Sequence, residues 1–218
     1  LLESKKLFLN VCSFIGHSAL RIWCMGEDAM QREANENEIL KMEKLVKKAM
    51  ESGAIGFATS TFEGHNGANG VPMPSRFASQ NEIIRLIEAM ASQGRGIFMI
   101  TKSNNDNIKD ITELLGSSNR PAMVAPILFN PTKKNWAINT LDDINEMKEK
   151  GFEIWGQVSC RPLTMEFTMQ EPYMLEGLNT WKKVMKAARQ EEVINIFRDI
   201  KFRESLLNEI NDKKKNKL

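Results

Sequence analysis

Short apolar segments alternate with amphipathic segments over the first 160 residues of the chain. Five segments are rich in apolar residues and bounded by turn residues, and they cover residues 7–15, 54–59, 97–100, 121–128 and 152–159. Such runs are typical of strands buried on both faces. Their regular alternation with helical segments predicts an α/β fold with a parallel sheet and right-handed crossovers.

Local signals set the bounds of the expected helices. Ser52 and Gly53 end a helix over residues 35–51, and Ser79 and Glu82 have the spacing of a capping box. A shorter helical piece is expected near residues 18–25. After residue 160 the alternation stops and residues 160–180 look irregular. Two or three helices are expected over residues 181–212, with Val184, Ile194, Phe197, Leu206, Leu207 and Ile210 as their buried positions.

Two architectures fit the alternation: part of a (β/α)8 TIM barrel, or an open doubly wound sheet. A doubly wound sheet often has a glycine-rich first turn, but residues 16–19 read Gly-His-Ser-Ala and match neither GxGxxG nor a Walker motif. The barrel is therefore favoured. Because closure needs eight strands, about five βα units predict an incomplete barrel. We expect residues 1–160 to hold these units, residues 161–212 to belong to the same domain, and residues 213–218 to form a basic disordered tail.

Charge and composition exclude several classes of protein. The 218 residues carry a net charge of +2, and four lysines among residues 212–218 account for the excess, since the remainder holds 26 basic and 27 acidic residues. This balance shows no footprint for nucleic acid. No apolar run has the length of a membrane span, and residues 1–6 lack the apolar core of a signal peptide. Three cysteines favour a reducing cytoplasm, with Cys12 as a buried, inert thiol.

In TIM barrels the chemistry lies at the carboxyl ends of the strands. The polar residues expected there follow each of the five strands and include a long loop over residues 60–78 that is rich in Gly, Pro and Asn. They are His17 and Arg21 after the first strand; Thr59, Ser60, Thr61, His65 and Arg76 after the second; Thr101 and Lys102 after the third; Asn130 after the fourth; and Gln157, Ser159 and Arg161 after the fifth.

Each of these candidates also has a structural alternative. His17 can bond a backbone carbonyl, Arg21 can pair with Glu27 or Asp28 on the surface, and His65 can be solvated in a loop. For Lys102, which lies near Asp106, a structural role is favoured over a Schiff-base role. Catalytic zinc sites use about three protein ligands and favour histidine. The chain has two histidines and no HxH or HExxH motif, so the sequence encodes no complete hydrolytic metal centre.

Several segments resemble the N-acyl-D-amino-acid deacylases of the amidohydrolase superfamily. Residues 10–27 are similar to the segment that contains the GH..lR motif, residues 51–60 to a GAlGfSts strand, and residues 74–79 to the vPSRlAs motif of one branch. Residues 94–96 and 157–163 also fit that branch. The resemblance spans residues 7–210, and the matching order of the motifs carries more weight than any one of them.

The resemblance implies a metal-dependent (β/α)8 hydrolase in which a zinc-bound water attacks an amide carbonyl. His17 and Arg21 fall on the GH..lR motif, and Ser75 and Arg76 on the PSR motif. The family's HxH motif and its late catalytic aspartate are expected outside this chain. Where the family places histidines after the third and fourth strands, this chain has Thr101 and Lys102, and residues 126–128.

We therefore expect part of an amidohydrolase that hydrolyses a non-peptide C–N bond, most simply the amide of an N-acyl-D-amino acid. Zinc would belong to the whole parent enzyme, and this chain alone is expected to be inactive. His17 and His65 are the catalytic candidates, with His65 in a lid; Arg76 is a candidate carboxylate clamp. Arg21, Ser60, Ser75, Lys102 and Gln157 complete the expected substrate-binding set.

Two other functions remain open at this point. One is a non-catalytic barrel piece with a binding role only, and a weaker one is a metal-free enzyme that uses Lys102. The expected partner is a small-molecule amide, without nucleic acid or membrane. Unpaired strand edges also predict self-association.

Overall fold

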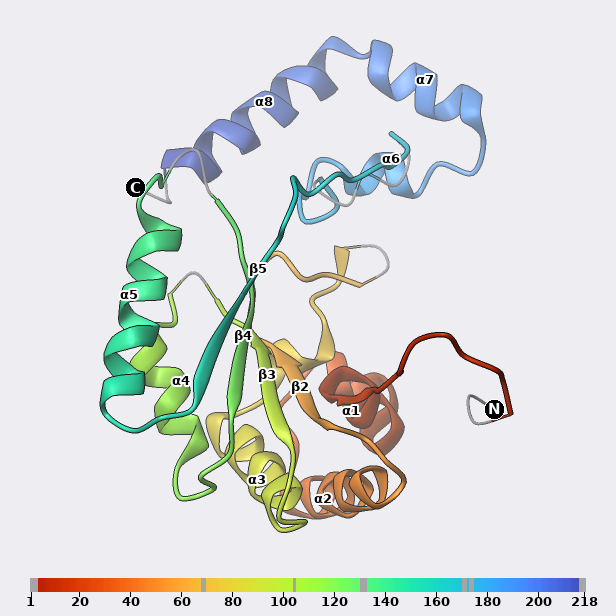
Figure 1. Cartoon of the computed structure of the whole chain (residues 1–218). Coiled ribbons are helices and arrows are strands. Elements are labelled where there is room, and N and C mark those ends of the chain that lie inside the picture. Colours follow the sequence, from red (N-terminus) through yellow and green to blue (C-terminus); the bar gives the residue numbers. More distant parts are fainter. Residues whose placement is uncertain are drawn as a thin grey trace. The chain divides into compact units, whose positions relative to one another are not determined.

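Five parallel strands and the helices between them form the sheet region of the protein (Figure 1). The computed structural model describes residues 4–67, 70–103, 105–129, 133–169, 172 and 175–215. The strands are β1 (Phe14–Gly16), β2 (Gly56–Ser60), β3 (Ile97–Thr101), β4 (Ala122–Ile127) and β5 (Ile154–Val158). The helices between them are α1 (His17–Met25), η1 (Gly26–Met30), α2 (Glu36–Glu51), η3 (Pro74–Phe77), α3 (Gln80–Ala91), α4 (Ile108–Leu115) and α5 (Trp136–Glu149). The predicted alternation is confirmed.

The order of the strands separates the two architectures that the sequence left open. The strands lie in the sheet in sequence order, β1-β2-β3-β4-β5, and all four pairs are parallel. Because parallel crossovers are right-handed, a sheet that adds every strand on the same side carries its helices on one face. A doubly wound sheet instead reverses its strand order at a switch point. The observed order is that of a (β/α)8 barrel, with five of its units present.

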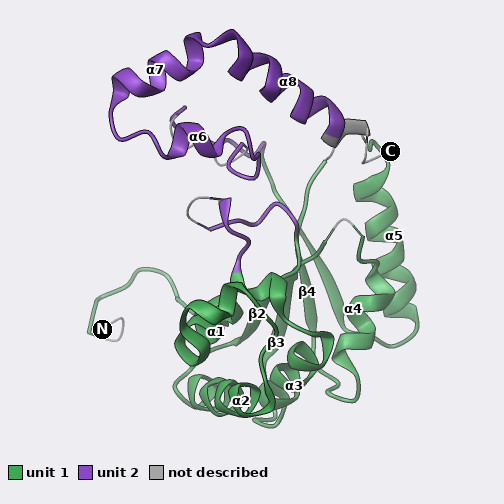
Figure 2. Ribbon diagram, turned by 180° about the vertical axis from the view of Figure 1, so that it is seen from behind, with its two compact units in different colours: residues 1–62, 74–161 green, residues 63–73, 162–218 purple. Residues whose placement is uncertain are grey.

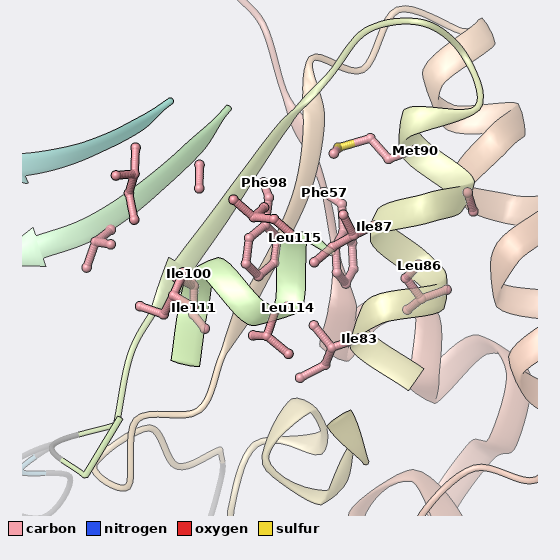
Figure 3. Close-up of a cluster of buried hydrophobic side chains, with 14 of the residues drawn as sticks. Phe57, Ile83, Leu86, Ile87, Met90, Phe98, Ile100, Ile111, Leu114 and Leu115 are labelled. Atoms are coloured by element: carbon pink, nitrogen blue, oxygen red, sulfur yellow. The ribbon is translucent and has the colours of Figure 1, made fainter. Parts of the chain in front are cut away.

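The face of the sheet that the helices cover is the core. Phe57 pairs in register with Phe98, Phe98 with Ala122, and Ala122 with Ile154, and all four side chains are buried. The rings of Phe57 and Phe98 stack with centroids 6.1 Å apart. Apolar side chains of α3 and α4 belong to the same cluster (Figure 3): Ile83, Leu86, Ile87, Met90, Ile111, Leu114 and Leu115. These apolar contacts fix the strands whose carboxyl ends carry the predicted site residues.

The opposite face of the sheet is more open. Ala58 pairs with Met99, Met99 with Met123, and Met123 with Trp155. The first three are half-buried, whereas Trp155 is 53% exposed. In a closed barrel this face lines the interior. Side chains that react in a barrel are therefore expected on this side, at the carboxyl ends of the strands.

The first predicted strand is wrong over most of its length. The expectation was a buried strand over residues 7–15, but β1 begins at Phe14, and Phe8 and Leu9 are 100% and 71% exposed. Cys12, expected to be buried, is exposed as well. Because β1 is the edge strand and pairs with β2 over three residues, the apolar residues upstream of Phe14 have no strand to pack against in the described sheet.

The described residues divide into two compact units (Figure 2). Unit 1 comprises residues 1–62 and 74–161, and unit 2 comprises residues 63–73 and 162–218. Unit 2 contains α6 (Lys182–Met185), α7 (Gln190–Arg198) and α8 (Ile200–Lys215). The two or three helices expected after residue 180 are thus present. The division of the chain expected at residues 160 and 212 stays a prediction, and α8 continues to Lys215.

Unit 2 has its own small core. Trp181 is 1% exposed, and its ring lies 5.7 Å from that of Phe197 and 6.1 Å from that of Phe202. Two positions expected to be buried are wrong: Ile194 is 41% and Leu207 is 59% exposed. Val193 on α7 and Phe202 on α8 are buried instead, in the same cluster as Trp181. Among the described helices, none combines the length and the apolar character that crossing a bilayer requires.

Candidate functional site

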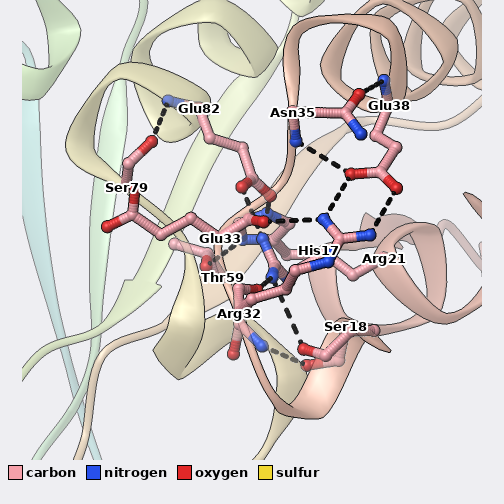
Figure 4. Close-up of polar contacts among 12 residues, drawn as sticks. His17, Ser18, Arg21, Arg32, Glu33, Asn35, Glu38, Thr59, Ser79 and Glu82 are labelled. Atoms are coloured by element: carbon pink, nitrogen blue, oxygen red, sulfur yellow. Dashed lines mark hydrogen bonds and ion pairs between the residues drawn. The ribbon is translucent and has the colours of Figure 1, made fainter. Parts of the chain in front are cut away.

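His17 lies at the point where β1 becomes α1, and both of its ring nitrogens have partners. Its Nε2 lies 2.8 Å from Oε1 of Glu82 at the start of α3, and its Nδ1 lies 2.7 Å from Oγ1 of Thr59 on β2 (Figure 4). The side chain is 1% exposed, and its ring meets that of Phe57 edge-on at 5.2 Å. His17 therefore joins three elements on the helix-covered side of the sheet.

Arg21, one turn along α1, binds the other oxygen of Glu82. Its NH1 donates to Oε2 of Glu82, and its NH2 donates to the backbone oxygens of Arg32, at 2.6 Å, and Ala29, at 3.4 Å. The alternative of a surface pair between Arg21 and Glu27 or Asp28 is wrong, because Arg21 is fully buried, and Asp28 pairs with Arg32 at 2.7 Å instead. Arg21 thus links Glu82 to the connection between α1 and α2.

Glu82 is a buried polar residue that the sequence analysis did not count among the candidate site residues. The spacing of Ser79 and Glu82 predicts a capping box, and Ser79 Oγ does accept from the backbone N–H of Glu82 at 3.2 Å. The carboxylate, however, contacts His17 and Arg21, so half of the predicted box is wrong. The sequence signal was present, because a Glu in the first turn of α3 is visible, but its distant partners are not.

The charges of this cluster balance without a proton on His17. Burial lowers the pKa of His17 and outweighs the hydrogen bond and charge of Glu82, which raise it, and Arg21 lowers it further. For Glu82, burial raises the pKa, but the hydrogen bonds from His17 and Arg21 and the positive charge of Arg21 together hold it below its usual value. A neutral His17 that donates from Nε2 and accepts the Thr59 hydroxyl at Nδ1 satisfies every atom of the ring.

This geometry favours a positioning role for His17 and Arg21. Binding a metal or taking a proton from a substrate needs a free nitrogen lone pair, and both nitrogens of His17 already have partners. Glu82 and Arg21 have side chains with 0% exposure. The catalytic role predicted for His17 and the substrate-binding role predicted for Arg21 stay predictions.

A second group of polar residues lies at the carboxyl end of β2. Ser75 Oγ donates to the backbone oxygen of Ser60 at 2.9 Å, and the Ser75 N–H donates to Oγ of Ser18 at 3.2 Å. These bonds attach the turn η3 to the end of β2 and to the first turn of α1. Arg76 follows Ser75 and is half-buried. The structure thus brings three of the predicted residues, Ser60, Ser75 and Arg76, to one edge of the sheet.

Lys102 belongs to a third group, at the carboxyl end of β3. Its Nζ donates to the backbone oxygens of Asp106, at 2.7 Å, and Ser103, at 3.2 Å, and lies 5.2 Å from the ring centroid of Trp136. Oδ2 of Asp106 accepts from Thr61 at 2.5 Å and from the Ser103 N–H at 3.1 Å. These contacts support the structural alternative for Lys102 and place its positive charge at the same edge as Arg76.

Three further residues were predicted for the site: Gln157, Asn130 and His65. Gln157 is exposed on β5, and Asn130 lies outside the described residues. His65 belongs to unit 2, where its backbone oxygen accepts from the N–H of Met73 at 3.2 Å. The roles predicted for Gln157 and His65 stay predictions.

The described residues do not fit the zinc centre that the family resemblance implies. Nowhere in the part of the chain that the structure describes do three or more His, Cys, Asp or Glu side chains come together to hold a metal ion. His17 has partners within the protein at both ring nitrogens. The described donor set therefore supplies no complete zinc site.

Comparisons with known proteins find distant relatives. The chain is 25% identical over 158 residues to an N-acyl-D-glutamate deacylase from Alcaligenes xylosoxydans xylosoxydans, a match that covers 70% of this chain and 30% of the relative. It is 34% identical over 90 residues to a D-aminoacylase from the same organism, covering 41% of this chain and 16% of the relative. The chain thus spans less than a third of the length of either relative. No family model matches it.

Solved structures show the same arrangement of strands and helices. The structure of N-acyl-D-glutamate deacylase from Bordetella bronchiseptica, in complex with zinc and a phosphonate inhibitor, matches with a TM-score of 0.60 at 20% identity, covering 74% of this chain and 33% of that one. A D-aminoacylase with a binuclear metal centre matches with a TM-score of 0.54 at 24% identity, covering 71% and 31%. These likenesses support the fold.

Proposed function

From the chain's distant similarity to N-acyl-D-glutamate deacylase and D-aminoacylase, we propose that its five βα units form part of an amidohydrolase barrel that acts on the amide of an N-acylated amino acid. The observation that carries the proposal is the sequence match over 158 residues, which spans 70% of the chain. The sequential order of the parallel strands agrees with it, because that order lets further strands extend the sheet toward closure.

Within this proposal the chain supplies residues that bind the substrate. Arg76 lies directly after Ser75, whose bonds to Ser60 and Ser18 fix the turn at the carboxyl end of β2. A guanidinium can bind a carboxylate with two parallel hydrogen bonds. Lys102 adds a second positive charge at the end of the next strand. Because an N-acylated amino acid carries a carboxylate, we assign its recognition to Arg76 and assign no catalytic step to a metal held by these residues.

Binding of N-acetyl-D-glutamate to the purified chain, measured by calorimetry or ligand-observed NMR, tests this assignment. We expect Arg76→Ala to weaken binding roughly tenfold or more, since hydrogen bonds to charged groups contribute about 1.5–3 kcal/mol. Arg120→Ala is the matched control, because Arg120 is half-buried like Arg76 but lies just before the amino end of β4, where it bonds the backbone oxygen of Gly94. Equal affinities for the wild type and both variants would remove Arg76 from the site.

A binding role without catalysis is the second candidate, and the lack of a metal-ligand set among the described residues favours it for this chain taken alone. Release of the free amino acid from N-acetyl-D-glutamate, assayed with and without added zinc, separates the two functions. We expect no release by the chain alone. Turnover that requires zinc and shows stoichiometric metal would establish an active centre and reject the purely binding role.

A further inference from the structure

Polar contacts attach helix α1 to the rest of unit 1, beside the apolar contacts of Leu20 and Cys24 with the core. Its buried residues are His17, Leu20 and Arg21, so two of the three belong to the cluster around Glu82. Its N-cap is Gly16, which gives no side-chain cap, and its first turn has no acidic residue. The helix has nine residues, a length that is marginal without tertiary contacts. Its position therefore depends on the bonds of His17 and Arg21.

The neighbouring helices are anchored differently. Helix α2 buries Ile39, Met42, Val46 and Met50, and it begins with a complete capping box at Asn35 and Glu38. Helix α4 buries Ile108, Ile111, Leu114 and Leu115 with Thr112, and has a capping box of its own. None of the buried side chains in these two helices is ionisable. A change in protonation inside unit 1 thus acts on α1 before it acts on α2 or α4.

The groups that face His17 do not balance the positive charge of an added proton. Arg21 faces it from α1 and Glu82 from α3, while β2 contributes the uncharged Thr59 and Phe57. From η3, Ser75 contacts the same helix through Ser18, and Arg76 next to it is half-buried. One cation and one anion already balance at 0% side-chain exposure. A proton on His17 adds a buried positive charge with no further anion among the groups that face it.

Movement of α1 reaches the edge of the sheet through Ser18. The hydroxyl of Ser18 accepts the N–H of Ser75, and Ser75 in turn bonds the last residue of β2, Ser60. The turn that carries Arg76 is therefore fixed from two sides, by β2 and by α1. Release of α1 removes one of these two attachments.

We infer that Glu82 is a positioning residue that fixes α1, and through Ser18 the Ser75–Arg76 turn, and that a proton on His17 releases this fixation. The sign follows from the lowered pKa of His17: the released state binds the proton more tightly, so release is favoured as the pH falls below the ordinary value of 6.5. This pH-dependent release of α1 is inferred from the geometry of unit 1 alone and is independent of the proposed function.

Hydrogen–deuterium exchange of the whole chain at pH 7.5 and pH 5.5, corrected for intrinsic rates, tests the inference. We expect amides of α1 and of residues 26–33 to lose protection by up to roughly tenfold, because pH 5.5 lies one unit below the ordinary pKa of 6.5 that His17 has in the released state, while α4 keeps its protection. A pH titration of the His17 ring by NMR is expected to show the same midpoint as the loss of protection. Equal changes in α1 and α4, or no change in α1, would overturn the inference.

Two variants distinguish the pH-dependent release of α1 from a general loss of stability of this helix. His17→Gln removes the titrating group, so α1 is expected to lose its pH dependence even if its protection is lower throughout. Leu20→Ala, the matched control, removes the remaining buried residue of α1 and leaves the cluster intact, so the pH dependence is expected to persist. If His17→Gln keeps the wild-type pH dependence, another group operates the release and the assignment to His17 is wrong.

Discussion

The Nε2 atom of His17 lies 2.8 Å from Oε1 of Glu82, although 65 residues separate them in the sequence. This contact ties the first crossover of the sheet to the second, because His17 begins α1 and Glu82 lies in the first turn of α3. With Arg21 on the other oxygen, one carboxylate fixes two helices, α1 and α3, that each begin at the carboxyl edge of the sheet.

Removal of the Glu82 carboxylate should therefore be costly. In Glu82→Ala the buried guanidinium of Arg21 loses its counter-ion, and breaking a buried ion pair from one side costs about 3–5 kcal/mol. Urea denaturation of the wild type and the variant measures this difference. Glu146→Ala is the control, since its pair with Lys150 is exposed on both sides and its loss should not change stability measurably. Equal midpoints for Glu82→Ala and the wild type would contradict the structural role given to Glu82.

The acid sensitivity of α2 should come from Glu38. Hydrogen bonds from Arg32, then the backbone N–H of Asn35, lower the pKa of Glu38 to about 2 despite the opposing effect of burial. A carboxylate with a lowered pKa stabilises the fold above its ordinary value of 4.5 and loses that contribution as the pH falls toward 2. The stability difference between the wild type and Glu38→Gln, about 1 kcal/mol for a helix cap, should shrink across this window. Chemical denaturation at pH 6 and pH 3 measures it; a constant difference would argue against the assignment.

Local patterns in the sequence predicted most of the fold. The strands β2 to β5 and the helices between them are set by apolar runs, apolar stripes and caps, which are local features. The errors lie where the outcome depends on a distant partner. Residues 7–13 are as apolar as the other strands, yet burial needs a neighbouring strand that the edge position of β1 does not provide.

The candidate site was predictable in part for the same reason. Positions after each strand could be read from the sequence, and Ser60, Ser75 and Arg76 do meet at one edge. The role of Glu82 could not be read, because the spacing to Ser79 is the same whether its carboxylate bends back to the N-cap or reaches His17. For Arg21 the sequence left open a role in the site and a surface pair with Glu27 or Asp28. Its partner in the structure is Glu82, which lies 61 residues away and gives no local signal.

Gly56 should tolerate no side chain, whereas Gly16 should. A Cβ on Gly56 would lie 1.9 Å from the backbone oxygen of Ile97 on the adjacent strand, a separation that real Cβ atoms do not reach. Gly56→Ala is expected to cost about 1–3 kcal/mol or more, because backbone of β3 must move. Gly16→Ala is the matched control in β1, where a Cβ meets nothing within 4 Å. Thermal unfolding of both variants checks this, and equal losses would show that the spacing of β2 and β3 is not as tight as the structure has it.

Trp181 should matter for its volume and not for its indole N–H. The side chain is 1% exposed, and its Nε1 has no hydrogen-bond partner in the described part of the chain. Trp181→Phe removes an unsatisfied buried donor and should be close to neutral, whereas Trp181→Ala should cost about 3–5 kcal/mol by leaving a cavity in the core of unit 2. Denaturation followed by helical circular dichroism compares the two. A large loss in Trp181→Phe would show that Nε1 has a partner that matters.

Self-association through the edge of the sheet is the last prediction. Strand β5 lies at one edge, carries no charged residue between Ile154 and Val158, and exposes 53% of Trp155 and 57% of Val158. Unpaired, uncharged strand edges are templates for pairing with another chain, and a lysine on the edge opposes it. We expect light scattering to show a mass that rises with concentration for the wild type and falls toward a monomer in Val158→Lys. Lys148→Ala on α5 is a useful companion, because Nζ of Lys148 lies 3.9 Å from the ring centroid of Trp155 and its removal should uncover the ring and increase association. A wild-type chain that stays monomeric at all concentrations would show that this edge does not recruit a second copy.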